Sequence, residues 1–283
     1  MARFAFTERL LAGVASLVLL CTALTVGAAA QSPASIPDFS SNGTSWQTNN
    51  GGEFIAVPGS PVPVRQDPAH PFVPNGQGKQ PTYRIADLTN SNLKQWAKDI
   101  MKKDNDEVLA GKIAFTPASS CKPAGVPAFM LAGGPYYFVQ SPKEVVIITQ
   151  GDHQVRRIHL DVPHSANPKP SWYGESVGHY EGDTLVIDTT GLNTKTFIDN
   201  YRTPHGDKLH VVERYRMIED GRTLEANVTI EDPAALKQPL RVTHRWRKVT
   251  GPIIESRCAD GESFNPFDTQ RVEKMPVADK SDF

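Results

Sequence analysis

The sequence predicts a mainly β protein, folded as a single antiparallel β-barrel or a β-sandwich with one covering helix. Two turn signals, Gly182-Asp183 and Asp220-Gly221, each separate runs in which apolar and polar residues alternate, which is the pattern of a two-residue β-hairpin. A succession of short strand-like runs follows one after another, with one clear helix and no alternation of strands with helices. This order is typical of an antiparallel barrel or sandwich in a single domain.

The amino terminus predicts export. Arg3 and Arg9 precede an apolar run over residues 10–26, and residues 28–30 are three alanines that offer a cleavage site. We therefore expect residues 1–30 to be a signal peptide and the mature protein to be periplasmic or extracellular, without stable membrane insertion after cleavage. An uncleaved anchor helix is the alternative.

Charge and cysteine content limit the possible partners. The formal net charge is −1 with histidines neutral, and basic residues such as Arg156 have acidic residues nearby, so we expect no nucleic-acid partner. Cys121 and Cys258 remain after signal cleavage. We predict that they form a disulfide, which would contribute about 4 kcal/mol in an oxidising compartment. A thiol nucleophile or a metal-ligand pair is the alternative, although C-x-x-C spacing is missing.

Residues 31–88 are rich in proline, glycine, serine and asparagine, and predict a linker or an extended arm laid over the domain. The β domain itself is expected over residues 89–262, followed by a polar tail over 263–283. Its amino-terminal part, Thr89 to Ala110, has the periodicity of a helix that covers one face or end of the sheet. The residues expected on its buried face are Leu93, Trp96, Ile100 and Met101.

The strands begin with Lys143–Gln150, which is apolar on both faces, and Gln154–Asp161. In the first hairpin, the turn at Gly182-Asp183 pairs Tyr180 with Leu185 and Gly178 with Ile187 on an apolar face that we expect in the core. The opposite face carries His179 and Asp188 as diagonal neighbours. The connection over residues 191–208 is long and polar, and predicts a surface excursion or a functional lid that holds His205.

In the second hairpin, the turn pairs Glu213 with Val228 and Tyr215 with Ala226 on an apolar face. The polar face pairs His210 with Glu231. The next strand, Pro239–Val249, places His244 on one face with Leu240, Val242 and Trp246, and a last strand is expected over Ile253–Cys258. We prefer a closed, calycin-like barrel because closure removes the exposed edges of these apolar strands, although a two-sheet sandwich also fits.

A family resemblance is carried by ESVGHYEGDTLVIDTTGLN, at residues 175–193, followed by PHGDKLHVVERYR and TIEDP. These runs resemble a family of exported bacterial proteins in which a G-H/R-W-E-G-D-T-L-V-V-D-T motif precedes P-H-S and E-R-Y/F-R. The resemblance covers roughly Cys121 to Cys258. Tyr180 stands where the family usually has tryptophan, and Gly206 where serine or threonine usually follows the histidine. It implies a shared architecture and no particular activity, because the family is uncharacterised.

The main candidates for chemistry are Glu213 and His244, two ionisable side chains on one predicted interior face. A carboxylate among apolar neighbours loses hydration, and a carboxyl group that is protonated near neutral pH can act as a general acid or base. The alternative is that an arginine such as Arg157 or Arg245 pairs with Glu213, and that His244 is a satisfied core histidine. The second candidate pair is His179 with Asp188, which suits either acid–base work or a surface ion pair.

Two classes of function follow from these candidates. The first is an exported enzyme that uses acid–base chemistry on a small organic molecule in a barrel pocket, as a lyase, isomerase or hydrolase. Glu213 and His244 would transfer protons, and Arg157, Tyr215, Trp246 and His205 would bind the ligand. The second is a non-catalytic barrel that binds an apolar or aromatic small molecule. We expect no cofactor and no metal. His205, His210 and Glu213 have H-x4-H-x2-E spacing, but no H-E-x-x-H motif is present and His210 should face away from Glu213.

Overall fold

The computed structural model describes residues 36–40, 43–49, 51–72, 84–112, 116–117, 122–150 and 155–251, all within one compact unit, Ala34–Phe283. The predicted signal peptide, the polar tail, the strand Ile253–Cys258 and both halves of the predicted disulfide, Cys121 and Cys258, lie outside these ranges.

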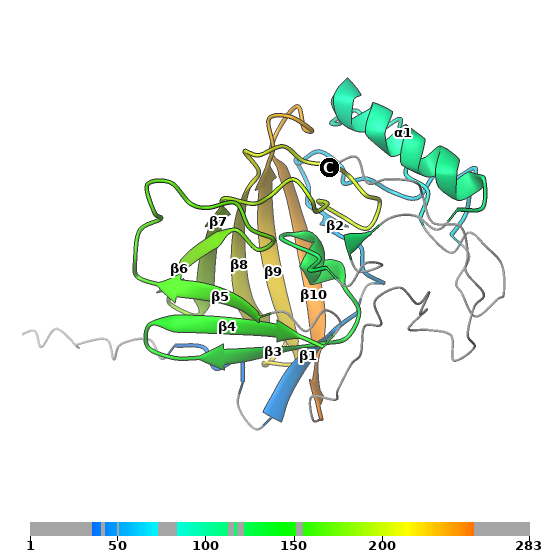
Figure 1. The fold of residues 1–283 in the computed structure, drawn as a ribbon. Coiled ribbons are helices and arrows are strands. Elements are labelled where there is room, and N and C mark those ends of the chain that lie inside the picture. Colours follow the sequence, from blue (N-terminus) through cyan, green and yellow to red (C-terminus); the bar gives the residue numbers. More distant parts are fainter. Residues whose placement is uncertain are drawn as a thin grey trace, which may run out of the picture. The chain divides into compact units, whose positions relative to one another are not determined.

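In the described residues, nine strands close into a mixed β-barrel, and β2 is an extra strand on β10 (Figure 1). The strands follow the order β1-β3-β4-β5-β6-β7-β8-β9-β10 around the barrel, and β1 pairs with β10 to close it. The elements are β1 (Thr44–Thr48), β2 (Ile55–Ala56), α1 (Gln95–Leu109), the 3-10 helix η4 (Ala128–Leu131), β3 (Pro135–Gln140), β4 (Glu144–Thr149), β5 (Val155–Leu160), β6 (Glu175–Glu181), β7 (Thr184–Thr190), β8 (His210–Ile218), β9 (Thr223–Glu231) and β10 (Leu240–Thr250).

The predicted barrel and the registers of both hairpins are confirmed. Tyr180 pairs with Leu185 and Gly178 with Ile187 across β6 and β7. Across β8 and β9, Glu213 pairs with Val228 and His210 with Glu231. One pairing differs from the expected antiparallel pattern, because β5 and β6 run parallel. The proline-rich connection between them returns the chain to the starting end of the barrel, as a parallel pair requires.

The stretch predicted as a linker or arm supplies β1, which stands between β3 and β10. Trp46 from this strand is fully buried, and its indole N–H donates to the carbonyl oxygen of Phe39 at 2.9 Å. The expected domain start at residue 89 therefore leaves out a strand of the barrel. The local composition hides β1 because it is only five residues long and has a single large apolar side chain.

Helix α1 begins at Gln95, six residues later than predicted, and it buries a different strip of its surface. Trp96, expected in the core, is 44% exposed. The buried positions are Ala97, Met101, Asn105 and Val108, a set at helical spacing that includes a polar residue. Asn105 is buried at no cost in hydrogen bonds, because its side chain accepts from the backbone nitrogen of Ala86 and donates to the carbonyl oxygen of the same residue. No helix in the described ranges is both long and apolar enough to cross a membrane.

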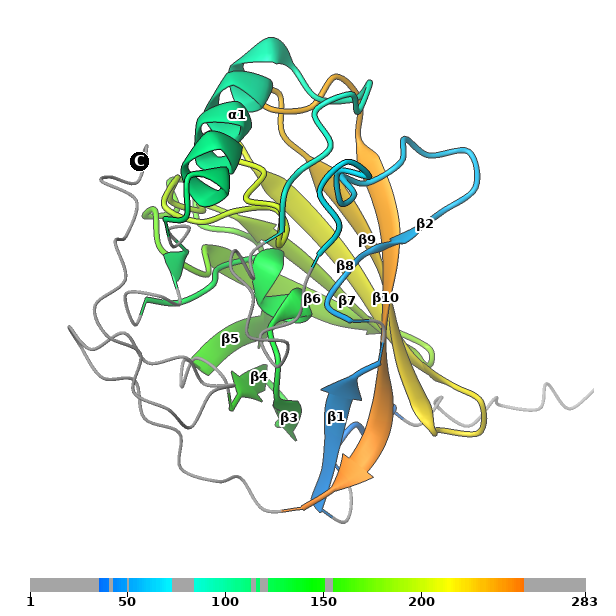
Figure 2. The same cartoon turned by 90° about the vertical axis from the view of Figure 1, so that its right-hand side faces the viewer.

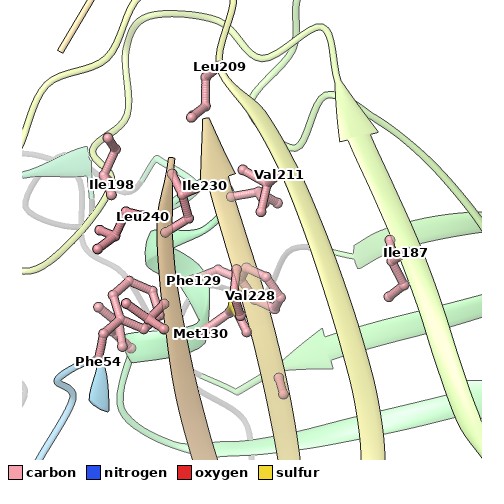
Figure 3. Close-up of a cluster of buried hydrophobic side chains, with 14 of the residues drawn as sticks. Phe54, Phe129, Met130, Ile187, Ile198, Leu209, Val211, Val228, Ile230 and Leu240 are labelled. Carbon is pink, nitrogen blue, oxygen red and sulfur yellow. The ribbon is translucent and has the colours of Figure 1, made fainter. Parts of the chain in front are cut away.

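Side chains from the inner faces of the strands fill the barrel. One buried cluster contains Phe54, Phe129, Met130 and Leu240 together with Val228, Ile230 and Val211 of β9 and β8 (Figure 3). Alternation along each strand explains the filling, since successive side chains point to opposite faces and the inward set is mostly large and apolar.

Gly178 of β6 is expected to tolerate no side chain. A β-carbon at this position would lie 2.8 Å from the carbonyl oxygen of Val186 and 2.9 Å from Cγ2 of Ile158. Gly178→Ala should therefore lower the free energy of unfolding by about 1–3 kcal/mol in urea titrations. The exposed neighbour His179→Ala is the control and should change it by less than about 0.5 kcal/mol. Equal effects of the two substitutions would contradict this packing.

Candidate functional site

An arginine–glutamate pair is buried inside the barrel. Arg156 of β5 and Glu213 of β8 form a two-pronged ion pair in which Nη1 donates to Oε1 at 2.9 Å and Nη2 donates to Oε2. Their side chains are 1% and 0% exposed. A planar guanidinium matches a carboxylate in this geometry, and such charge-assisted bonds are among the strongest in proteins.

Polar groups surround this pair on both sides. Arg156 Nη2 also donates to Thr189 Oγ1 at 2.9 Å and Ser176 Oγ at 3.2 Å, and its guanidinium lies 4.8 Å from the centre of the Phe129 ring. The Tyr215 hydroxyl donates to Glu213 Oε1 at 2.8 Å. Burial, together with the nearby carboxylate, raises the pKa of Tyr215 well above its ordinary value. Both oxygens of Glu213 are thus engaged inside the protein, and this carboxylate balances an internal cation.

Arg157 was predicted to line a pocket, and this prediction is wrong. Its side chain is 64% exposed on the outer face and pairs with Glu144, with Nε 2.6 Å from Oε1. The inward residue is its neighbour Arg156, which has the same parity along β5 as Ile158 and Leu160. That alternation was visible in the sequence and could have identified Arg156 as the partner of Glu213.

His244 and Trp246 lie on the inner face of β10, as predicted, and both are buried. The register places His244 opposite Ala226, and Ala226 opposite Tyr215. His244 is therefore level with Tyr215, which lies two residues from Glu213 along β8. Its Nδ1 lies 3.2 Å from the backbone oxygen of Glu53. Burial lowers the pKa of His244 to about 4, so the ring is neutral at physiological pH.

His205 lies in the long connection between β7 and β8 and is buried, with 2% exposure. Its Nε2 lies 2.8 Å from Thr196 Oγ1 and its Nδ1 lies 2.9 Å from the carbonyl oxygen of Gly206. Burial lowers the pKa of this histidine as well. The bond to Thr196 ties together two positions within this loop, so His205 is placed to hold the loop rather than to face an open pocket.

A cluster of titratable side chains lies on the outer face of the barrel around Asp188; we call it the Asp188 cluster. His164 Nε2 and His210 Nε2 both contact Asp188 Oδ1, at 2.9 Å and 3.0 Å. The second nitrogen of each ring meets another carboxylate: Nδ1 of His164 lies 3.1 Å from Glu175 Oε1, and Nδ1 of His210 lies 3.2 Å from Glu231 Oε2. All five side chains are between 24% and 48% exposed.

The predicted pairing of His179 with Asp188 is wrong in its contacts. Both side chains are on the outer face, but His179 Nε2 lies 3.0 Å from Glu181 Oε1, two residues along its own strand. Asp188 instead turns towards His210 on β8 and His164 in the connection before β6. Alternation along a strand predicts which face of the sheet a residue lies on, but it does not predict which neighbour its side chain contacts.

Sequence reasoning found part of the Asp188 cluster. The register gave Asp188 to the outer face and paired His210 with Glu231. His164 was missed because it lies in a proline-rich connection without periodicity. Its neighbour Ser165 holds Glu175 by hydrogen bonds from its hydroxyl and its backbone N–H, and these bonds lower the pKa of Glu175.

The described residues form no metal site, and a small cavity lies among them. No group of three or more histidine, cysteine, aspartate or glutamate side chains in those ranges is arranged to hold a metal ion. A small cavity of about 10 Å³ lies between the segment around Phe54 and the loop around Tyr201. It has room for about one water molecule.

No family model matches the chain, and no curated protein matches it. The resemblance to an exported bacterial family stays a prediction.

The buried neutral state of His244 predicts a pH-dependent stability. Because its pKa falls from about 6.5 in the unfolded chain to about 4 in the fold, the unfolded state binds more protons between these values, and stability is lost as the pH falls. From pH 7 to pH 4 the free energy of unfolding should drop by roughly 3 kcal/mol more in the wild type than in His244→Phe. Denaturant titrations at both pH values measure the difference, and an equal drop in the two proteins would contradict it.

Proposed function

We propose that the protein is an exported enzyme that performs acid–base chemistry on a small organic molecule at the Asp188 cluster. One observation carries this proposal: two imidazole rings converge on a single carboxylate oxygen on a partly exposed surface. The three side chains come from the connection before β6, from β7 and from β8, so the fold assembles them from separate parts of the chain.

The arrangement gives each group a distinct role. Asp188 Oδ1 accepts both imidazole contacts, and in the described part of the chain no hydrogen bond is made to Oδ2. That free oxygen can accept a proton from a substrate carbon or hydroxyl group. Both nitrogens of each ring face carboxylate oxygens, so His164 and His210 hold Asp188 in place with its second oxygen directed away from the two rings. Glu175 and Glu231 fix the orientation of the two rings.

Proton transfer of this kind favours a lyase or an isomerase over a serine hydrolase. Ser165, next to His164 in the sequence, donates to Glu175 Oε2 at 2.5 Å rather than to an imidazole. The Thr190 hydroxyl lies 3.5 Å from His164 Nδ1, but the same nitrogen is closer to Glu175, at 3.1 Å. A serine nucleophile needs a base at its hydroxyl group, and here that base is an acceptor-only carboxylate already shared with a histidine. The barrel interior adds no site for this chemistry, because the side chains of Arg156 and Glu213 are buried and paired with each other.

Deuterium exchange tests the proposal on a panel of compounds rather than on one chosen substrate. Purified protein is incubated in D₂O with small keto acids and sugar acids, and mass spectrometry detects exchange of the C–H next to the carbonyl group. We expect exchange with at least one compound, and Asp188→Asn should slow it at least about 100-fold because it removes the proton acceptor and keeps the shape.

His159→Asn is the matched control, because His159 is an exposed histidine on β5 outside the cluster. It should leave exchange unchanged, and both variants should keep the wild-type unfolding midpoint. Exchange that Asp188→Asn retains, or a panel without exchange in the wild type, would contradict the proposal. A compound that co-purifies unaltered would favour the non-catalytic binding barrel instead.

A further inference from the structure

Two buried nitrogen atoms on β10, Nε2 of His244 and Nε1 of Trp246, have no hydrogen-bond partner among the described residues. The side chains are 0% and 1% exposed, and their ring centres are 4.5 Å apart. Because Nδ1 of His244 donates to the backbone oxygen of Glu53, Nε2 is an acceptor in the neutral ring, whereas the indole N–H is a donor. A neighbouring donor and acceptor, both buried and both unsatisfied, are rare in native proteins and point to a ligand that serves both.

These two side chains lie at the seam where the barrel closes. β1 ends at Thr48, opposite Trp246, and β2 pairs only with Val242 and Thr243. Both strands run along the same edge of β10 (Figure 2). Residues Gly51–Phe54, which we call the seam loop, connect them at the level of His244. At this level the neighbour of β10 on that edge is a loop and not a paired strand, and Glu53 and Phe54 of the loop contact the His244 ring.

Aromatic rings pack against the His244 and Trp246 side chains. Phe54 of the seam loop meets the His244 ring edge-on, with centres 6.2 Å apart. Tyr215 stacks on Trp246 at 5.8 Å, and Tyr136 meets the same indole edge-on at 5.7 Å. The cavity of about 10 Å³ is lined by Glu53 and Phe54, the two residues that cover His244. A ligand larger than water therefore enters only when the seam loop moves.

Polar contacts from other segments hold the seam loop in place. Asn200 Nδ2 donates to the carbonyl oxygen of Gly52 at 2.7 Å, and Arg84 Nη2 donates to that of Gly51 at 2.7 Å. The Tyr201 hydroxyl donates to Glu53 Oε1 at 2.8 Å. Each of these hydrogen bonds contributes little net free energy when water can replace the lost partner, so a ligand that satisfies His244 and Trp246 can offset their loss.

We propose that the seam loop gates a binding site for a small aromatic molecule with a hydroxyl group. The hydroxyl donates to Nε2 of His244 and accepts from the Trp246 indole N–H, and the aromatic ring takes the place of Phe54 beside the His244 ring. The site is inside the barrel, whereas the Asp188 cluster is on its outer face. An experiment that contradicts one of the two proposals therefore leaves the other untouched.

Phenol and toluene form a matched pair of probes, because toluene has a methyl group in place of the hydroxyl group that the site would bind. In NMR titrations of the full mature chain, phenol should shift the His244 imidazole and Trp246 indole signals in a saturable manner. Toluene should bind at least about fivefold more weakly, as expected for the loss of one or two buried hydrogen bonds. Phenol that leaves both signals unmoved up to its solubility, or toluene that binds equally well, would overturn the proposal.

Two variants separate gating from simple packing. His244→Phe should weaken phenol binding at least about fivefold, since it removes the acceptor. Tyr201→Phe removes one anchor of the seam loop and leaves the ring in place, so it should tighten phenol binding about tenfold by making the open loop more populated. Arg157→Gln, on the outer face of β5, is the control and should change neither. If His244→Phe does not fold, an unchanged phenol affinity in Tyr201→Phe is by itself enough to refute the gate.

Discussion

The pair of Arg156 and Glu213 is the interaction on which the barrel depends most. It joins β5 to β8 across the interior, and β6 and β7 stand between these strands in the sheet. Two charges withdrawn from water are costly unless each has its partner and further hydrogen bonds, and here Ser176, Thr189 and Tyr215 supply them. The pair also fixes which residues of β5 face inward, and so helps to set the register of the parallel strands β5 and β6.

A filled interior has consequences for function. Many small barrels hold ligands in an open mouth, but in the described part of this chain the inner face is occupied by Arg156, Glu213 and several aromatic side chains. Titratable groups with access to solvent are instead found on the outer face, where Asp188 joins His164 and His210. The inner face keeps two unsatisfied nitrogens at the barrel seam, where a loop takes the place of a strand. The two proposals therefore concern opposite faces of the barrel wall and different kinds of chemistry.

Local sequence rules predicted more of the fold than of the site. Turn chemistry and alternation gave the registers of both hairpins and the inward positions of Glu213, Tyr215, His244 and Trp246. The same alternation indicates that Arg156 faces inward, although Arg157 was the arginine predicted to line the pocket. Local rules could not give β1, because its partners are about 90 and 200 residues away in the sequence and its own composition is polar. Nor could they give His164, whose place beside Asp188 depends on the path of an irregular connection.

A double-mutant cycle on the central pair tests most directly whether it holds the barrel together. Arg156→Met and Glu213→Leu each leave one charge buried without its partner, and each should lower the free energy of unfolding by about 3–5 kcal/mol. The double variant removes both charges. Its loss in free energy of unfolding should therefore be smaller than the sum of the two single losses, by at least about 2 kcal/mol. Single losses below about 1 kcal/mol, or losses that simply add, would contradict the central place of this pair.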